Sequence, residues 1–227
     1  MATPYDPCEY PEDMDAGILP IKGLATAKQR LAPDFGDEDR REIAMALAQD
    51  AMKLARSSSF LTWWVVSNDD EVHDLARSSG LNGVKDEGEG LNPAVRQAIE
   101  VVTREGATSA TIVPSDVPLA YSGDVLDLVD TGATSEIVLV PSAKDGGTNA
   151  LYIRPPELIV PRFGRSSMQA HLALAERLGH RCSILVLPRL ALDIDTVEDV
   201  DEFLTKDKVG KSATAAVLNR LRGNGAA

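Results

Sequence analysis

The chain has 227 residues and a net charge of −12, with 44% hydrophobic and 26% charged side chains. This composition is typical of a globular protein with one sizeable core, and it favours one domain over two. The acidic balance argues against nucleic acid as a partner, because DNA- and RNA-binding domains usually carry a basic surface. No apolar run approaches the roughly 18 residues of a membrane span. Cys8 and Cys182 form neither a disulfide framework nor a metal cluster, so we expect a cytoplasmic protein.

Strand-like and helix-like segments alternate along the sequence. Strands are predicted at 18–21, 61–67, 81–85, 109–114, 136–141, 149–153 and 182–187, and helices at 37–57, 70–79, 92–102, 122–130, 167–178 and 196–205. This alternation predicts an α/β fold with a mostly parallel sheet covered by helices on both faces. Residues 1–15 are acidic and are predicted to form a disordered extension. A single domain is predicted at 16–205, followed by a basic tail, helical in part, at 206–227.

Three cations follow the first predicted strand. Lys22, Lys28 and Arg30 lie within nine residues of one another on the loop that begins after Ile21. Open α/β sheets bind their ligands at the carboxyl edge of the strands, where this loop begins. Lysine supplies a point charge and arginine a forked contact to phosphate oxygens. The loop therefore predicts a site for an anionic ligand, although a solvated basic loop has the same composition.

Acidic residues stand at two later strand ends. Asp116 follows an apolar strand between two prolines, and Asp193 and Asp195 lie two residues apart, so an extended chain points both to one side. Magnesium prefers carboxylate oxygens, and we predict that Asp116 and Asp195 bind it together. The alternatives are a turn cap for Asp116 and a helix N-cap formed by Asp195 or Thr196.

Two further segments are rich in glycine and hydroxyl groups. In DGGTNAL, Gly147 allows close approach of an anion to the backbone and Thr148 adds a hydroxyl, but a tight hairpin turn explains Asp-Gly-Gly equally well. In PRFGRSSMQAH, a predicted helix is preceded by Gly164, Ser166 and Ser167. A helix N-terminus can bind an anion, so these residues are candidates for an anion site. His171, one turn into that helix, is more often a packed histidine than a catalytic one.

A third, shorter segment precedes the helix predicted from residue 92. Gly90, Leu91 and Asn92 either cap that helix, with Asn92 as the N-cap and Pro93 as its first residue, or bring backbone groups to a base or ribose. No Ser/His/Asp set, Cys/His site, Walker loop or dinucleotide fingerprint is present in the sequence. With these kinds of site excluded, the remaining interpretation is a site for phosphate and magnesium on an α/β sheet.

Six segments together resemble one known family. PIKGLATAKQRLAP, GLNPAV, PSDVP, DGGTNAL, PRFGRSSMQAH and LDIDTVEDV resemble the CofC/FbiD guanylyltransferases of coenzyme F-420 biosynthesis, over roughly residues 17–204. The resemblance implies a Rossmann-like nucleotidyltransferase fold of the nucleotide-diphospho-sugar transferase type, a three-layer sandwich. It also implies magnesium-dependent transfer of GMP from GTP to a small phosphorylated three-carbon acid, with release of pyrophosphate.

The resemblance also implies roles for individual residues. Lys22, Lys28 and Arg30 would hold the triphosphate, Gly90, Leu91 and Asn92 would lie near the guanosine, Asp116 and Asp195 would bind Mg²⁺, and Gly147, Thr148, Gly164, Ser166 and Ser167 would bind the acceptor. Lys28, Arg30 and Asp116 are the predicted catalytic residues. The family divides among 2-phospho-L-lactate, phosphoenolpyruvate and 3-phospho-D-glycerate, and the sequence does not choose between these acceptors. It also leaves open whether the chain forms a homodimer.

Three other functions are compatible with these residues. A related nucleotidyltransferase would act on a molybdopterin or a sugar phosphate, and it would use a different acceptor or CTP. A non-catalytic protein would bind GTP without releasing pyrophosphate, which the presence of both Asp116 and Asp195 disfavours. A purely structural α/β domain would bind neither magnesium nor GTP.

Overall fold

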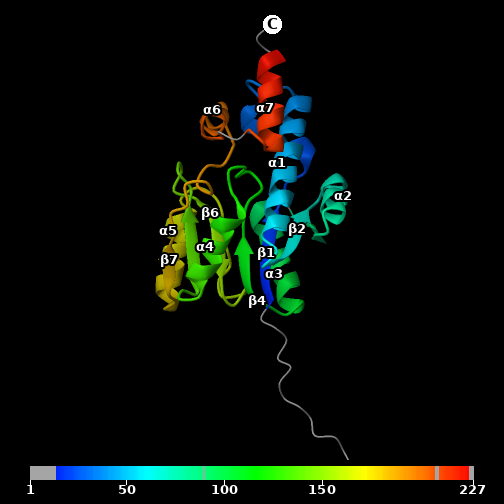
Figure 1. Cartoon of the computed structure of the whole chain (residues 1–227). Coiled ribbons are helices and arrows are strands. Elements are labelled where there is room, and N and C mark those ends of the chain that lie inside the picture. Colours follow the sequence, from blue (N-terminus) through cyan, green and yellow to red (C-terminus); the bar gives the residue numbers. More distant parts are fainter. Residues whose placement is uncertain (1–13, 89, 208–209, 225–227) are drawn as a thin grey trace, which may run out of the picture.

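The computed structural model describes residues 14–88, 90–207 and 210–224. Its strands form one sheet in the order β3-β2-β1-β4-β6-β5-β7 (Figure 1). They are β1 Met14–Pro20, β2 Thr62–Ser67, β3 Asn82–Lys85, β4 Ala107–Ile112, β5 Ile137–Pro141, β6 Thr148–Ile153 and β7 Cys182–Ile184. All neighbouring pairs are parallel except those of β6, which runs antiparallel to β4 and β5. The prediction of a mostly parallel sheet is confirmed.

Helices cover both faces of the sheet. The helices are α1 Asp37–Ser57, α2 Asp70–Ser78, α3 Leu91–Arg104, α4 Ser122–Gly132, α5 Ser167–Leu178, α6 Val197–Lys206 and α7 Ala213–Asn224. Apolar residues of α1, α2 and α4 share one buried cluster with the sheet, whereas those of α3 and α5 share another. The predicted three-layer α/β sandwich is therefore confirmed. Among the described residues, none of the helices is long and apolar enough to cross a membrane.

A third apolar cluster joins α1 to the last two helices. Ile43 of α1, Phe203 of α6 and Leu218 of α7 are all fully buried there. Asp50 of α1 accepts hydrogen bonds from the first backbone N–H groups of α7, at Ala213 and Thr214, and a carboxylate is favourable at a helix N-terminus. Figure 1 shows α7 in red beside α1. The packed region thus extends beyond the predicted domain end at residue 205.

The other predicted boundary shifts as well. β1 begins at Met14, so the last two residues of the predicted 1–15 extension belong to the sheet, where the Asp15 carboxylate accepts a hydrogen bond from Ser109. The remainder of that extension, residues 1–13, lies outside the described residues. At the far edge, β7 ends at Ile184 instead of the predicted Leu187, because its pairing with β5 ends there.

The start of α3 corrects another prediction. Gly90, with φ of +96°, is the N-cap, and the helix begins at Leu91, so Asn92 is not the cap. Glycine adopts this positive φ without steric penalty, which lets the chain turn into the helix there. The Asn92 side chain instead accepts a hydrogen bond from the Phe163 N–H at 2.7 Å and donates one to its carbonyl at 3.1 Å. Asn92 therefore ties α3 to the loop before α5.

Candidate active site

Several chain segments meet at one edge of the sheet. The parallel strands β1, β4 and β5 end at this edge, and the antiparallel β6 begins there with Thr148. The loop after β4 is joined to the segment before α6 by a 2.9 Å hydrogen bond from the Ile194 N–H to the Asp116 carbonyl. This bond places Asp195, next in sequence, beside the Asp116 loop. The two predicted metal ligands are therefore brought together from distant parts of the sequence.

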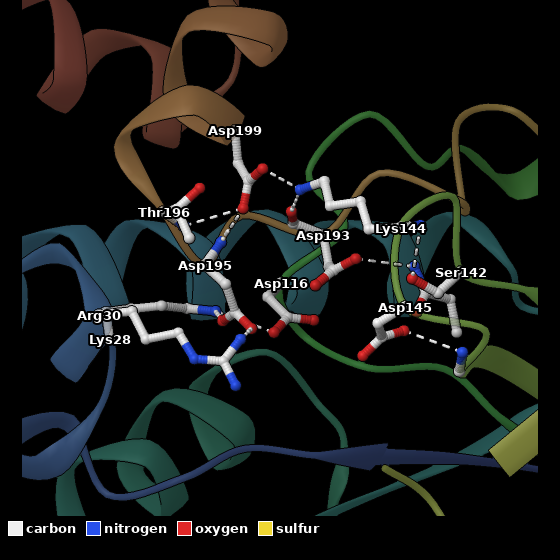
Figure 2. Close-up of polar contacts among 12 residues, drawn as sticks. Lys28, Arg30, Asp116, Ser142, Lys144, Asp145, Asp193, Asp195, Thr196 and Asp199 are labelled. Carbon is white, nitrogen blue, oxygen red and sulfur yellow. Dashed lines mark hydrogen bonds and ion pairs between the residues drawn. The ribbon is translucent and has the colours of Figure 1, made fainter. Parts of the chain in front are cut away.

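Lys28 lies between these two carboxylates (Figure 2). Its ammonium nitrogen is 2.8 Å from Oδ2 of Asp116 and 3.2 Å from Oδ1 of Asp195. The guanidinium of Arg30 is 3.3 Å from the other carboxylate oxygen of Asp195, and the Arg30 side chain is 62% exposed. Two of the three predicted phosphate-binding cations thus contact acidic side chains in this structure, whereas the third, Lys22, is exposed and lines the cavity at this site.

The surroundings of Lys28 favour its charged form. Burial by itself would lower the pKa of the Lys28 ammonium, but the carboxylates of Asp116 and Asp195 outweigh it and raise that pKa above its ordinary value. The Lys28 backbone has φ of +54°, a left-handed conformation that costs a non-glycine residue about 1–3 kcal/mol. Among the described residues, Ser166 is the other non-glycine residue with positive φ, and it also lies at this edge. Such strain is concentrated at functional sites.

Asp193 is a third carboxylate of the cluster, and it is not one of the two predicted magnesium ligands. Burial raises its pKa, and the negative charges of Asp116 and Asp195 raise it further. The Asn149 side chain donates a hydrogen bond to it at 3.2 Å. The spacing predicted that Asp193 and Asp195 point to one side of an extended chain, but it did not show that this side faces Asp116.

Lys144 and Asp199 brace the segment that carries these acids (Figure 2). One oxygen of Asp199 accepts the backbone N–H groups of Asp195 at 2.9 Å and Thr196 at 2.8 Å, and the other pairs with the Lys144 ammonium. Lys144 also donates to the Asp193 carbonyl at 3.2 Å. Burial opposes ionisation of Asp199, yet these donors lower its pKa. Thr196 is the N-cap of α6, so Asp195 itself is free of that role.

The donor set fits magnesium. Among the described residues, no group of three or more His, Cys, Asp or Glu side chains is arranged to hold a metal ion. However, Asp116 and Asp195 both direct an oxygen at one cationic atom, the Lys28 nitrogen. Magnesium in nucleotide sites is usually held by one or two carboxylates together with substrate phosphates and water. Two carboxylates would therefore suffice if substrate phosphates bind beside them and the Lys28 ammonium moves aside.

Two adjoining pockets form a cleft along this edge. The first, about 410 Å³, is lined by Gly23, Asn68, Asp86, Gly88, Gly90 and Ala94 among others. The second, about 360 Å³, is lined by Lys28, Arg30, Asp116, Asp145, Gly164, Arg165 and Asp195 among others. The two pockets adjoin, because four residues line both of them: Pro20, Ile21, Lys22 and Leu91. Asn92 lines neither of them, unlike its neighbours Gly90 and Leu91.

The two glycine-rich segments pack against each other beside the second pocket. Backbone N–H groups of Ser166 and Met168 donate to the carbonyls of Asp145 and Gly146, at 3.2 and 3.1 Å. Gly147 donates to the Asp145 carboxylate at 2.8 Å, and a side chain at Gly147 would lie 3.3 Å from the Gly164 carbonyl. The predicted acceptor-binding residues of both segments are thereby collected in one place.

Thr148, Ser167 and His171 form a buried hydrogen-bonded chain within this group. The Ser167 hydroxyl donates to Thr148 Oγ1 at 3.2 Å, and Nδ1 of His171 lies 3.1 Å from the same oxygen. The three residues are 7%, 3% and 1% exposed, respectively, and they are not among the residues that line the second pocket. Burial lowers the pKa of His171 to about 4. The sequence showed this histidine but gave no indication of its partners.

Comparison with known proteins gives concordant matches. The family described as "Guanylyl transferase CofC like" matches residues 15–222. A phosphoenolpyruvate guanylyltransferase of Chloroflexus aggregans is 34% identical, with 84% of this chain and 96% of the relative covered. A 2-phospho-L-lactate guanylyltransferase of Methanothermobacter thermautotrophicus is also 34% identical, over 82% of each chain.

A solved structure matches the fold. The structure of a candidate nucleotide-diphospho-sugar transferase from Desulfovibrio desulfuricans G20 aligns with a TM-score of 0.75 and 16% identity, and the alignment covers 94% of this chain and 96% of the other. This likeness shows that the sheet and its helices belong to the nucleotide-diphospho-sugar transferase fold.

Proposed function

The chain belongs to the CofC-like guanylyl transferase family, and from this premise we propose its reaction and the residues that carry it out. The protein is a guanylyltransferase of coenzyme F-420 biosynthesis. It moves GMP from GTP to the phosphate of a three-carbon phospho-acid and releases pyrophosphate. The acceptors to be compared are phosphoenolpyruvate, 2-phospho-L-lactate and 3-phospho-D-glycerate, which differ by a few atoms.

One observation carries the assignment of the site. The cleft holds three cations, Lys22, Lys28 and Arg30, directly beside the carboxylates of Asp116 and Asp195. A triphosphate needs positive charge, and magnesium needs carboxylate oxygens. A protein of net charge −12 would otherwise repel such a ligand. Both requirements are met within one pocket of a chain from a guanylyltransferase family.

The first pocket is the proposed site of the guanine base. It lies beyond Lys22, on the side away from Asp116, and it contains the partly buried carboxylate of Asp86. The Gly88 N–H donates to Oδ1 of Asp86 at 2.9 Å and so orients this carboxylate. Guanine presents two adjacent donors, N1–H and the 2-amino group, which a carboxylate can accept together. Adenine and cytosine lack this donor pair, so Asp86 would select GTP.

The reaction needs positioning more than proton transfer. The acceptor phosphate is mostly ionised near neutral pH, since its second pKa is near 6. One of its oxygens forms a bond to the α-phosphorus of GTP while the bond from that phosphorus to the β-phosphate oxygen breaks. The electron pair leaves with pyrophosphate, so no proton has to be removed first. Lys28 and Arg30 would neutralise the charge that develops on the departing pyrophosphate.

Asp116 and Asp195 would hold magnesium for this reaction. When bound, the ion would offset phosphate charge and help to align the α-phosphate with the acceptor oxygen. Lys28 is placed to exchange partners, from the two carboxylates to the phosphates of the incoming nucleotide. Asp193, whose raised pKa reflects its burial and its two acidic neighbours, would add negative charge that attracts a cation to the same place.

Pyrophosphate release tests the proposal. Purified protein is incubated with GTP, magnesium and each acceptor separately, pyrophosphatase is added to draw the reaction forward, and products are identified by mass spectrometry. We expect one acceptor to give a guanylylated product, and Asp116→Asn to abolish its formation without loss of fold. Asp127→Asn, at an exposed position of α4, is the matched control. GTP binding without product from any of the three acceptors would contradict the proposed reaction.

A further inference from the structure

The hydrogen-bonded chain at Thr148 has a defined direction. The backbone N–H of Arg162 donates to Nε2 of His171 at 2.9 Å, and an amide N–H can only donate. Nε2 therefore carries no proton. A neutral imidazole then has its proton on Nδ1, and this proton points to Thr148 Oγ1 at 3.1 Å. The tautomer of His171 is thus set by the Arg162 backbone.

This direction determines what the Thr148 hydroxyl can do. Thr148 Oγ1 accepts one hydrogen bond from His171 and a second from the Ser167 hydroxyl at 3.2 Å. A hydroxyl oxygen has two acceptor lone pairs and one proton. Both lone pairs are used, and the proton of Thr148 takes part in neither bond. Thr148 is therefore prepared as a donor, which suits an anionic ligand.

We infer that His171 is a positioning residue that directs the Thr148 hydroxyl proton to an anionic group of the phospho-acid acceptor. This inference rests on the proposed function, because it needs the acceptor beside Thr148. The loop interactions support that location, since Thr148 follows Gly147, where an added Cβ would lie 3.3 Å from the carbonyl oxygen of pocket-lining Gly164. His171 itself would not touch the acceptor. Its contribution is to keep Thr148 from turning its proton inward, towards Nδ1.

Two substitutions of His171 test the hydrogen bonds of its two ring nitrogens separately. An asparagine amide reaches the position of Nδ1, so His171→Asn keeps a donor to Thr148 but loses the acceptor for the Arg162 N–H. A glutamine amide reaches the position of Nε2, so His171→Gln keeps that acceptor but loses the donor to Thr148. A purely structural histidine would respond to both losses in a similar way. A positioning histidine responds mainly to the loss of its Nδ1 proton.

Steady-state kinetics with each substrate varied in turn tests the inference. We expect His171→Gln to raise the KM for the acceptor by about tenfold, as for a lost hydrogen bond to a charged group, with the KM for GTP unchanged. His171→Asn should remain near wild type. Equal acceptor KM values in the two variants, or parallel rises of both KM values, would overturn the inference. An inactive wild-type protein would instead overturn the proposed function.

A second measurement does not depend on turnover or on folding of the variants. Nitrogen NMR of the wild-type protein with labelled histidine distinguishes protonated from unprotonated ring nitrogens for the three histidines of the chain. The His171 signals are assigned through the neighbouring Phe163 ring, whose centroid is 5.9 Å from that of the imidazole. We expect this histidine to stay neutral at pH 6 with its proton on Nδ1. If it is instead protonated on Nε2, or charged at pH 6, the inference is wrong.

Discussion

The ammonium nitrogen of Lys28 lies 2.8 Å from Oδ2 of Asp116, although the two residues are 88 positions apart in the sequence. Lys28 therefore contacts the same carboxylate that is proposed to bind magnesium. The ammonium and the metal ion cannot both occupy the space between Asp116 and Asp195. Metal binding and the position of Lys28 should be coupled.

Replacement of Lys28 tests this coupling. Lys28→Met retains the bulk of the side chain but removes the charge that neutralises Asp116 and Asp195. We expect magnesium to bind the nucleotide-free variant several-fold more tightly, as measured by titration calorimetry. Turnover should fall by about 100-fold or more, because a charge that stabilises the transition state is lost. Lys53→Met, which removes a cation at an exposed position of α1, is the control and should leave both quantities near wild type. Unchanged or weaker magnesium binding in Lys28→Met would refute the competition.

Asp199 is expected to influence catalysis without contacting substrate. Its carboxylate holds the backbone of Asp195 and Thr196, so Asp199→Asn weakens the brace that orients a metal ligand. Loss of such a supporting partner typically costs about 10–100-fold in metal affinity or activity. We expect a decrease of that size in kcat, with a higher magnesium concentration needed for half-maximal rate. Asp201→Asn changes an exposed acid of the same helix, which pairs with Arg222, and should leave both quantities near wild type.

Base specificity provides a separate prediction for Asp86. Xanthine keeps the N1–H donor of guanine but has a carbonyl in place of the 2-amino group. Asparagine offers one acceptor and one donor, so Asp86→Asn should lose activity with GTP and gain activity with xanthosine triphosphate. The measurement is kcat/KM for both nucleotides, with Asp70→Asn on the exposed surface of α2 as the control. A variant that loses both activities equally would argue against a contact between Asp86 and the base.

The lowered pKa of His171 predicts how stability changes with pH. The folded-state pKa is about 4, against an ordinary value of 6.5. As pH falls from 6.5 to 4, the unfolded chain gains this proton before the folded protein does, so the free energy of unfolding decreases. The contribution of His171 should amount to about 3 kcal/mol and level off below pH 4. Urea unfolding of wild type and His171→Asn is measured at several pH values. Because the carboxylates titrate in both proteins, the difference between the two free energies of unfolding isolates the contribution of His171. Parallel pH profiles would contradict this prediction.

Much of the fold could be predicted from the sequence because its periodicity is strong. The helix at Ser167–Leu178 has the predicted bounds, and the mostly parallel sheet follows from the alternation of strands and helices. The direction of β6 was harder to predict from the sequence. The Asp-Gly-Gly segment before β6 indicated a hairpin turn and an anion-binding loop equally well. The structure shows that β6 pairs antiparallel with β5. Asn92 was misplaced as the N-cap because Gly90, with its positive φ, starts the helix two residues earlier.

The candidate site was predictable where a residue type and a strand end coincide. Asp116 and Asp195 were selected in this way, and the structure brings them to one lysine. Residues whose role depends on a partner far away in the sequence could not be predicted. The contact between Lys144 and Asp199, and the bond between Arg162 and His171, each depend on how two loops pack. No local pattern encodes either contact.

The most direct test of the central claim follows the phosphorus atoms of GTP. GTP labelled radioactively at the α-phosphorus, and in a parallel reaction at the γ-phosphorus, is incubated with the protein, magnesium and each phospho-acid. If the acceptor phosphate attacks the α-phosphorus, the α label will appear in the acceptor product and the γ label in pyrophosphate. Transfer of the γ label to the acceptor, or retention of both labels in GTP by folded and nucleotide-bound protein, would contradict guanylyl transfer.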